Sequence, residues 1–221
     1  MARKTKEEAL KTRRLLLDAA IEQFALHGVS NTTLTDIADA AGVTRGAVYW
    51  HFASKSELFN KMWQEQLPLR DLIHHKLIQQ DGVNPLIDLR NTFVAGLQYI
   101  AETPRQRALM QILYHKCEFI NGMMSEHEIR KKIGFNYDVI RAVLQACIRN
   151  NILPADTDVE IILIILHSAF SGIIKHWLLD PQQFDLSRQA PLLVDNIMAV
   201  ICGNSLWAIH SPAIARLDLN G

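Results

Sequence analysis

The chain is poor in cysteine and has no long uninterrupted hydrophobic run. Its three cysteines, Cys117, Cys147 and Cys202, are odd in number and lie far apart among 221 residues. This spacing supports neither a disulfide framework nor a Cys-x-x-Cys metal site, so reduced thiols are expected. The most apolar segment, 161–174, contains His167 and is shorter than the roughly 18–20 residues that cross a bilayer. We expect a buried helix there and no contact with a membrane.

An excess of charge of either sign is also absent. Lysine and arginine number 23, as do aspartate and glutamate, which argues against a protein coated with basic charge. A local basic patch can still bind nucleic acid, and residues 1–14 are such a patch, because six basic residues stand there against Glu7 and Glu8. The charged N-terminus has no apolar run, so we expect no signal peptide and a cytoplasmic protein.

Motifs of catalysis and metal binding are missing as well. The sequence has no Gly-rich phosphate loop, no G-x-S-x-G and no H-E-x-x-H. The adjacent His74 and His75 would point about 100° apart on a helix, and His115 and Cys117 also face differently. We therefore expect no catalytic residue, no metal site and no cofactor.

Helical periodicity dominates what is present. Apolar residues recur at three- and four-residue spacing, and no convincing alternating strand pattern is found. Cap residues and first-turn prolines mark helix starts, as in Asn84-Pro85 and Thr103-Pro104. The sequence predicts an all-α fold of about nine helices, with segments at 8–27, 34–41, 45–51, from 55, from 85, from 104, 126–150, 158–179 and 189–208.

The two short helices at 34–41 and 45–51 have the spacing of a helix-turn-helix. Thr33 is placed to cap the first helix, Gly42 permits the turn, and Thr44 is placed to cap the second. In this motif the second helix enters the major groove, with its N-terminal residues toward base edges. Arg45 at that end can form two hydrogen bonds with guanine, worth about 1–3 kcal/mol of discrimination.

Residues 32–59, "TTLTDIADAAGVTRGAVYWHFASKSELF", resemble the DNA-binding signature of TetR-family transcriptional repressors, over about residues 10–60. Stretches at 1–13, 109–119 and 170–179 resemble the AcrR-like branch, whose members repress genes for multidrug efflux pumps. The resemblance implies a homodimer, with an N-terminal DNA-binding domain at 1–54 and a C-terminal ligand-binding and dimerisation domain at 55–221.

The resemblance also implies which residues contact double-stranded operator DNA. Val48 and Phe52 are expected in the core instead, and the indole of Trp50 could equally pack against the first helix. The implied DNA contacts are Thr33, Thr44, Arg45, Gly46, Ala47, Tyr49, Trp50, His51 and Lys55.

A small-molecule inducer is the second partner that the resemblance implies. One acid among aromatic residues suits lipophilic cations, although each of these residues could equally belong to the core or the surface. The implied pocket residues are Trp63, Phe93, Tyr114, Glu118, Phe119 and Trp177. The segments 161–178 and 192–202 are apolar around much of their circumference, which predicts either a dimer interface or full burial.

Two other classes of function stay open at this point. One is a constitutive DNA-binding or architectural protein without an inducer, which predicts a solid apolar core. The other is a helical small-molecule enzyme on the same fold, which predicts turnover independent of Arg45. No residue pattern in the sequence favours either of them.

Overall fold

The structure is a computed structural model that describes residues 6–73 and 84–203. Within these ranges all regular secondary structure is helical, with eleven α-helices and one π-helical segment and no strand, which confirms the all-α class and exceeds the predicted count. The histidine pair His74–His75, the basic residues Arg3 and Lys4, and the predicted helix end at 204–208 lie outside the described residues, as does the side chain of Cys202.

The chain forms two compact units. The first comprises Met1–Leu67 and Pro104–Gly134, and the second comprises Pro68–Thr103 and Phe135–Gly221. The predicted boundary between residues 54 and 55 separates a DNA-binding domain from a ligand-binding domain, whereas these two units are defined by which residues pack together. That boundary stays a prediction.

The first unit is built around its N-terminal helix α1. This helix packs against α2, α3, α4, α7 and the π-helix η2. Its fully buried Phe24 meets Phe59 of α4, with ring centroids 6.2 Å apart. The elements of this unit are α1 (Lys6–His27), α2 (Leu34–Ala40), α3 (Arg45–His51), α4 (Lys55–Gln64), α7 (Pro104–Gln111), η2 (Ile112–Lys116) and α8 (Glu126–Ile133).

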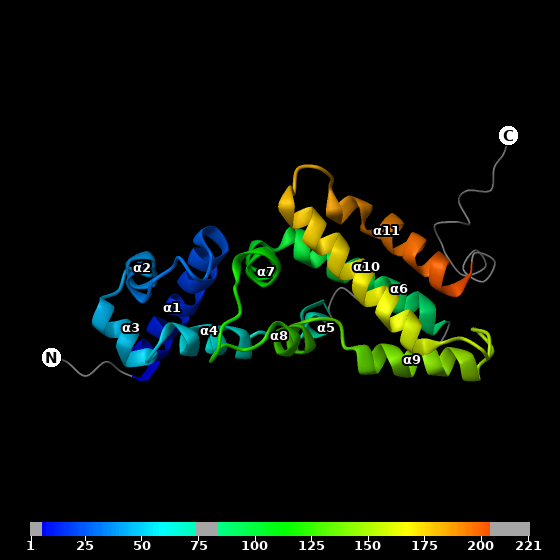
Figure 1. Cartoon of the computed structure of the whole chain (residues 1–221), viewed down its shortest axis with the longest axis horizontal. Coiled ribbons are helices and arrows are strands. Elements are labelled where there is room, and N and C mark those ends of the chain that lie inside the picture. Colours follow the sequence, from blue (N-terminus) through cyan, green and yellow to red (C-terminus); the bar gives the residue numbers. More distant parts are fainter. Residues whose placement is uncertain (1–5, 74–83, 204–221) are drawn as a thin grey trace. The chain divides into compact units, whose positions relative to one another are not determined.

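The second unit is built around α6. This helix packs against α5, α9 and α11, and α10 packs against α9 and α11, as Figure 1 shows. Asn84 caps α6 and Pro85 occupies its first turn, as the sequence predicts. The elements are α5 (Leu69–Ile73), α6 (Pro85–Glu102), α9 (Tyr137–Arg149), α10 (Val159–Leu179) and α11 (Leu186–Cys202).

Three phenylalanines form the aromatic centre of the second unit. The ring of Phe93 lies 4.8 Å from that of Phe135 and 4.3 Å from that of Phe170, centroid to centroid. Gly96 makes this packing possible, since a Cβ there would stand 2.8 Å from Phe135 Cζ. The contact fixes the start of α9 against α6.

The predicted helix 126–150 is wrong as a single element. The chain leaves helical geometry at Gly134, where a Cβ would stand 2.6 Å from the carbonyl oxygen of Arg130. Asn136 then caps α9 by accepting hydrogen bonds from the N–H groups of Asp138 and Val139. The apolar periodicity continues across the break, which is why the sequence pattern hides it.

The helix α10 confirms the predicted segment 158–179 and extends beyond the apolar run 161–174 at both ends. Its 21 residues make it the one described helix that is long and apolar enough to cross a membrane, a test that the core helix of a soluble protein also passes. Leu166, Phe170 and Trp177 are buried, whereas Ile161 and Ile164 are more than half exposed. The helix therefore has a core-facing side and an apolar side that the described part of the chain leaves exposed.

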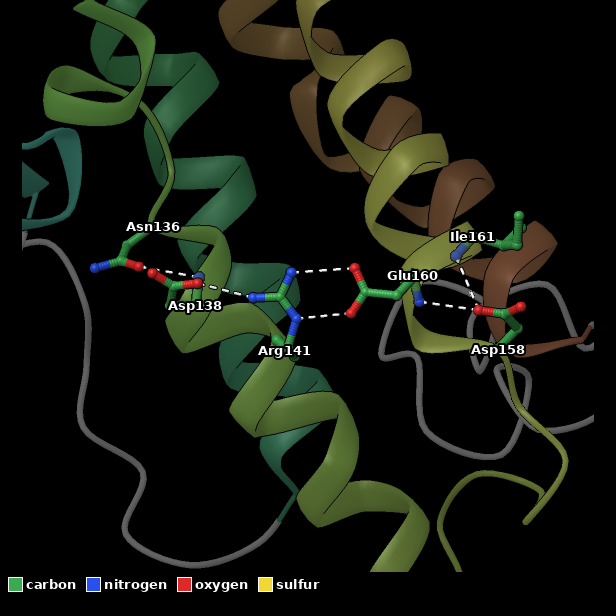
Figure 2. A network of polar contacts seen from close by, with 6 residues as sticks. All are labelled: Asn136, Asp138, Arg141, Asp158, Glu160 and Ile161. Carbon is green, nitrogen blue, oxygen red and sulfur yellow. Dashed lines mark hydrogen bonds and ion pairs between the residues drawn. The ribbon is translucent and has the colours of Figure 1, made fainter. Parts of the chain in front are cut away.

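A polar network joins the first turns of α9 and α10. Figure 2 shows Arg141 between Asp138 and Glu160, with two hydrogen bonds of 2.7 and 3.1 Å to the Glu160 carboxylate. The hydrogen bonds from Arg141 hold the pKa of Glu160 below its usual range. Asp158 caps α10 by accepting from the N–H groups of Glu160 and Ile161. The network therefore ties α9 to the start of α10.

Candidate DNA-binding surface and ligand pocket

The first helix of the helix-turn-helix begins at a complete capping box. The Thr33 hydroxyl accepts from the Asp36 N–H at 3.1 Å, and the Asp36 carboxylate accepts from the Thr33 N–H at 2.7 Å. The hydrogen bonds that the Asp36 carboxylate accepts, first from the Thr33 N–H and then from the Thr33 hydroxyl, hold the pKa of Asp36 below its usual range. Asp36 is therefore ionised at neutral pH, and the start of α2 is fixed locally.

Glycine forms the turn between the two helices. Gly42 has a φ of +65°, the left-handed region that side chains disfavour, and no atom lies close to where a Cβ would stand. Its N–H donates to the Asp39 carbonyl, and the Val43 N–H donates to the Ala38 carbonyl. These bonds close α2 and redirect the chain into α3, as the sequence predicts.

The helix α3 has a buried side and an exposed side. Val48 and the following Phe52 are almost fully buried, which confirms their place in the core. Thr44 caps the helix by accepting from the Ala47 N–H at 3.3 Å. At Gly46 no atom lies closer than 4.0 Å to the position that a Cβ would occupy. Because Gly46 has no side chain, a partner can approach the helix backbone closely there.

The exposed side of α3 carries large side chains with polar tips. Trp50 is 72% exposed and Tyr49 is 48% exposed, so Trp50 does not pack against the core. The Trp50 ring instead meets His51 edge to face, with centroids 4.5 Å apart. The guanidinium of Arg45 lies over the Tyr49 ring, 5.5 Å from its centroid. The exposed side chains of Tyr49 and Trp50 can therefore meet a partner outside the chain.

Lys55 is placed differently from the other predicted DNA contacts. Its ammonium donates to the carbonyl oxygens of Val29, Ser30 and Thr32, at 2.7, 3.2 and 2.9 Å. In the neighbouring cap of α4, the Ser54 hydroxyl accepts from the Glu57 N–H, and the Glu57 carboxylate accepts from the Ala53 N–H. A phosphate contact by Lys55 stays a prediction.

The six predicted ligand residues are divided between the two units. Phe93 and Trp177 lie in the second unit and are buried. The other four lie in the first unit, where Glu118 is exposed and the Tyr114 hydroxyl accepts from Arg130 at 2.9 Å. The four are Trp63, Tyr114, Glu118 and Phe119.

Trp63 has an unusual environment within the first unit. Its side chain is fully buried, and its indole N–H has no acceptor in the described part of the chain. Phe59 contacts both Trp63 and Phe119, with ring centroids 6.1 and 6.4 Å apart. A buried donor without an acceptor is costly, and a ligand oxygen could satisfy it.

A cavity of about 210 Å³ lies between α6 and α9 in the second unit. Its wall is mostly apolar, with Asp88 as the one ionisable lining residue beside Thr92 and Asn136. Phe93 is the one lining residue among the predicted ligand contacts, and the sequence does not predict the others because α6 and α9 are far apart along the chain. The remaining lining residues are Pro85, Leu89, Phe135, Val139, Ile140 and Val143.

Groups that could support redox or metal chemistry are few. Among the residues that the structure describes, no group of three His, Cys, Asp or Glu side chains could hold a metal ion. Cys117 and Cys147 are free thiols, and burial, with the charges of Glu118 and Glu126, raises the pKa of Cys117 to about 11. Cys117 is therefore protonated, and not a nucleophile, at neutral pH.

The capped helices, the turn at Gly42 and the exposed side of α3 define a helix-turn-helix DNA-binding regulator. The family described as "Bacterial regulatory proteins, tetR family" matches residues 16–62, and "MAATS-type transcriptional repressor, C-terminal region" matches residues 84–202. The chain belongs to the TetR family of transcriptional regulators.

Relatives with known structures or curated descriptions support this membership. The chain is 53% identical over 198 residues to the probable acrEF/envCD operon repressor of Escherichia coli K12, which covers 90% of each chain. The structure of NalD, the secondary repressor of the MexAB-OprM multidrug efflux pump in Pseudomonas aeruginosa, is 32% identical. It aligns with a TM-score of 0.72, covering 88% of this chain and 99% of NalD. The SmeT–triclosan complex is 28% identical, with a TM-score of 0.66 and coverage of 89% and 94%.

Proposed function

We propose that this chain represses genes for multidrug efflux transporters as a cytoplasmic homodimer, and that small lipophilic or cationic ligands release it from a pseudo-palindromic operator. The observation that carries the proposal is the exposed polar side of α3, in a chain whose second unit contains an apolar cavity with one carboxylate. The relatives support the proposal that the regulated genes encode efflux transporters, since the Escherichia coli protein is described as an operon repressor and NalD as an efflux-pump repressor.

In this proposal the residues of the helix-turn-helix reader, residues 33–51, have different roles. Arg45 reads a base edge in the major groove, and Gly46 and Ala47 let α3 approach closely. The N-terminal N–H groups of α2 and α3, beside Thr33 and Thr44, face phosphates, as do Tyr49, Trp50 and His51. Phosphate contacts place the helix, and base contacts select the sequence.

Uncovered apolar surface on α10 and α11 supports the homodimer. Ile161, Ile164 and Leu179 of α10, and Leu192 and Val200 of α11, are more than half exposed. Exposed aliphatic side chains on two helices that pack on each other support a subunit interface there. A two-fold dimer would place two copies of α3 about 34–36 Å apart, one turn of DNA.

The cavity between α6 and α9 supports a ligand with one or two rings. An apolar cavity of roughly 150 Å³ takes a benzene molecule, so one of this size has room for a small substituted aromatic. Asp88 favours a cation in this cavity. The buried Trp63 N–H is a separate candidate contact within the first unit. SmeT is a relative with a triclosan complex, which makes triclosan a suitable probe.

Release requires that the ligand and the operator favour different states of the dimer. Each then weakens the other by the same factor, because the coupling free energy is shared between the two sites. A coupling of about 1–3 kcal/mol is typical and changes affinity by roughly 5- to 150-fold.

The test is a selection of genomic DNA fragments by the purified chain, with Arg45→Ala in parallel. We expect a few pseudo-palindromic sites upstream of transporter genes that the variant does not enrich. Adding triclosan, or benzyltrimethylammonium as a small aromatic cation, should then release the selected duplex in a gel-shift titration. Equal, sequence-independent binding by both proteins would contradict the proposal and favour an architectural protein. Binding of the probes without any change in operator affinity would contradict the inducer part alone.

A further inference from the structure

The ammonium group of Lys55 is fully used inside the protein. It has three N–H donors, and the structure gives it three carbonyl acceptors, those of Val29, Ser30 and Thr32. All three belong to the loop between α1 and α2, more than 20 residues earlier in the chain. A phosphate bound by this group would have to replace at least one of them.

The loop that Lys55 holds is also fixed from other directions. The Val29 N–H donates to the carbonyl of Lys116 at 2.8 Å, and the Thr32 hydroxyl donates to the carbonyl of Gly28 at 2.8 Å. Val29 and Thr32 are each 1% exposed. Since their carbonyls lie in partly buried surroundings, removing the ammonium would leave acceptors that water reaches poorly.

The loop leads directly into the DNA-facing part of the reader. Its last residue, Thr32, precedes Thr33, the cap of α2, whose N–H groups the proposed function places at a phosphate. A shift of the loop therefore moves the start of α2 and changes the angle at which α2 supports α3. Lys55 stands at the N-terminus of α4, so it connects that helix to the reader through the loop.

We propose that Lys55 is a positioning residue for DNA binding, which acts by fixing the loop 28–32 and the start of α2 and not by contacting phosphate itself. This inference rests on the proposed function, because it assigns a role within operator binding. It departs from the phosphate contact that the family resemblance implies for this lysine.

Salt dependence separates the two roles. A lost phosphate contact flattens the slope of log affinity against log salt concentration by about 0.9, because one fewer counterion is released. A lost positioning contact lowers affinity at every salt concentration and leaves that slope in place, since the phosphate contacts are formed by other groups.

Two substitutions of Lys55 and one matched control provide the test. Lys55→Met removes the ammonium, and Lys55→Arg keeps the charge but replaces three convergent donors by a planar group. Lys61→Met removes an exposed lysine from the same helix. Folding of each variant is checked by circular dichroism, and Lys55→Arg carries the test if Lys55→Met does not fold.

Operator affinity is measured by fluorescence anisotropy from 50 to 300 mM salt, with the best duplex from a selection of random double-stranded DNA. We expect Lys55→Met and Lys55→Arg each to weaken binding about tenfold with an unchanged slope, and Lys61→Met to match the parent. Full affinity in Lys55→Arg, or a slope flattened by about 0.9 in Lys55→Met, would overturn the inference. A parent chain that selects no duplex would instead contradict the proposed function.

Discussion

The proposed DNA-facing surface comes from one continuous stretch of chain, residues 33–51, whereas the apolar cavity is lined by two segments, 85–93 and 135–143, that are distant in sequence. The capping bonds of the reader join residues three apart, such as Thr33 and Asp36. The cavity instead depends on non-local packing, such as that of Phe135 against Phe93 and Gly96. A local motif can be recognised residue by residue, while a cavity exists only where distant helices meet.

The two regions also differ in what they leave exposed. The reader exposes side chains with polar tips, such as Tyr49 and Trp50, that need a polar partner. The second unit exposes aliphatic residues on α10 and α11, such as Ile164 and Leu192, that need an apolar one. Substitutions in the second unit should therefore affect stability and ligand binding, and substitutions in the reader should affect operator recognition.

The largest effect is expected at the ion pair between α6 and α11. Arg90 donates to both carboxylate oxygens of Asp195, at 2.8 and 3.0 Å, and the two side chains are only 11% and 6% exposed. Asp195→Ala leaves a buried guanidinium without its partner, so we expect a loss of about 3 kcal/mol in the free energy of unfolding. Urea titration at fixed protein concentration measures it.

The control for this prediction is the ion pair between Arg105 and Asp18 in the first unit, whose side chains are 47% and 53% exposed. Asp18→Ala should cost less than about 1 kcal/mol, because solvent screens an exposed pair. Equal losses in the two variants would show that burial does not set the strength of the α6–α11 pair.

A smaller effect is expected at the Arg45–Tyr49 contact on α3. Removing the aromatic ring by Tyr49→Leu frees the guanidinium that lies over it, so discrimination at the base pair that Arg45 reads should fall by about 0.5–1 kcal/mol. Tyr49→Phe keeps the ring and should keep the discrimination. Competition between operators substituted at single base pairs measures it.

An Arg45→Ala background sharpens this second prediction. There Tyr49→Leu should no longer change base discrimination, because the guanidinium that the ring positions is absent. If Tyr49→Leu weakens binding to every duplex equally, the ring acts on the DNA backbone and not on Arg45.

The cavity carboxylate should have a modest effect on ligand choice. Asp88→Asn should weaken binding of benzyltrimethylammonium about two- to threefold, since Asp88 is exposed and its charge is screened. Neopentylbenzene, which has the same shape without the charge, should bind the parent and the variant equally. Calorimetric titration compares the two ligands.

The control is Asp71→Asn, which removes a first-turn carboxylate from α5 in the same unit that is not part of the cavity lining. Its cation affinity should equal that of the parent. A comparable loss in Asp71→Asn would mean that the overall charge, and not the cavity, attracts the cation.

The smallest effect concerns pH and the network of Figure 2. Arg141→Met should raise the pKa of Glu160 toward 4.5, since the hydrogen bonds from Arg141 lower it in the parent. A lowered folded-state pKa stabilises the protein above about pH 4.5, and this contribution disappears as the pH falls through the folded-state value. The parent and the variant should therefore differ at pH 7 and converge in acid.

Carboxyl NMR titration gives the Glu160 pKa directly. Arg149→Met, at the exposed C-terminal end of the same helix, should leave it unchanged. The pKa of Asp36 should also stay low in both variants, because its cause is the local capping box with Thr33. A shift of Asp36 in Arg141→Met would contradict the view that the reader is fixed locally.

Much of the fold could be predicted because its signals are local. The caps Thr33, Thr44 and Asn84 and the turn at Gly42 depend on neighbouring residues, and the structure has each where the sequence predicts it. The break at Gly134 could not be predicted from periodicity, since the apolar pattern is the same on either side of it.

The sites show the same division. The sequence motif marks the residues of the reader, but it does not reveal that the Lys55 ammonium meets three carbonyls from a loop before α2. Of the cavity lining, only Phe93 is among the predicted ligand residues, and Asp88 and Asn136 carry no signal that distinguishes them from helix-start residues. Their role depends on which helices face each other.

The sequence by itself determined the helices, their caps and the helix-turn-helix, because hydrogen bonds and apolar spacing within a few residues decide these features. Only the tertiary structure decided the lining of the cavity, the use of Lys55 and the apolar surface left on α10 and α11. Those features depend on contacts between residues far apart in the chain, and such contacts exist only after the helices pack.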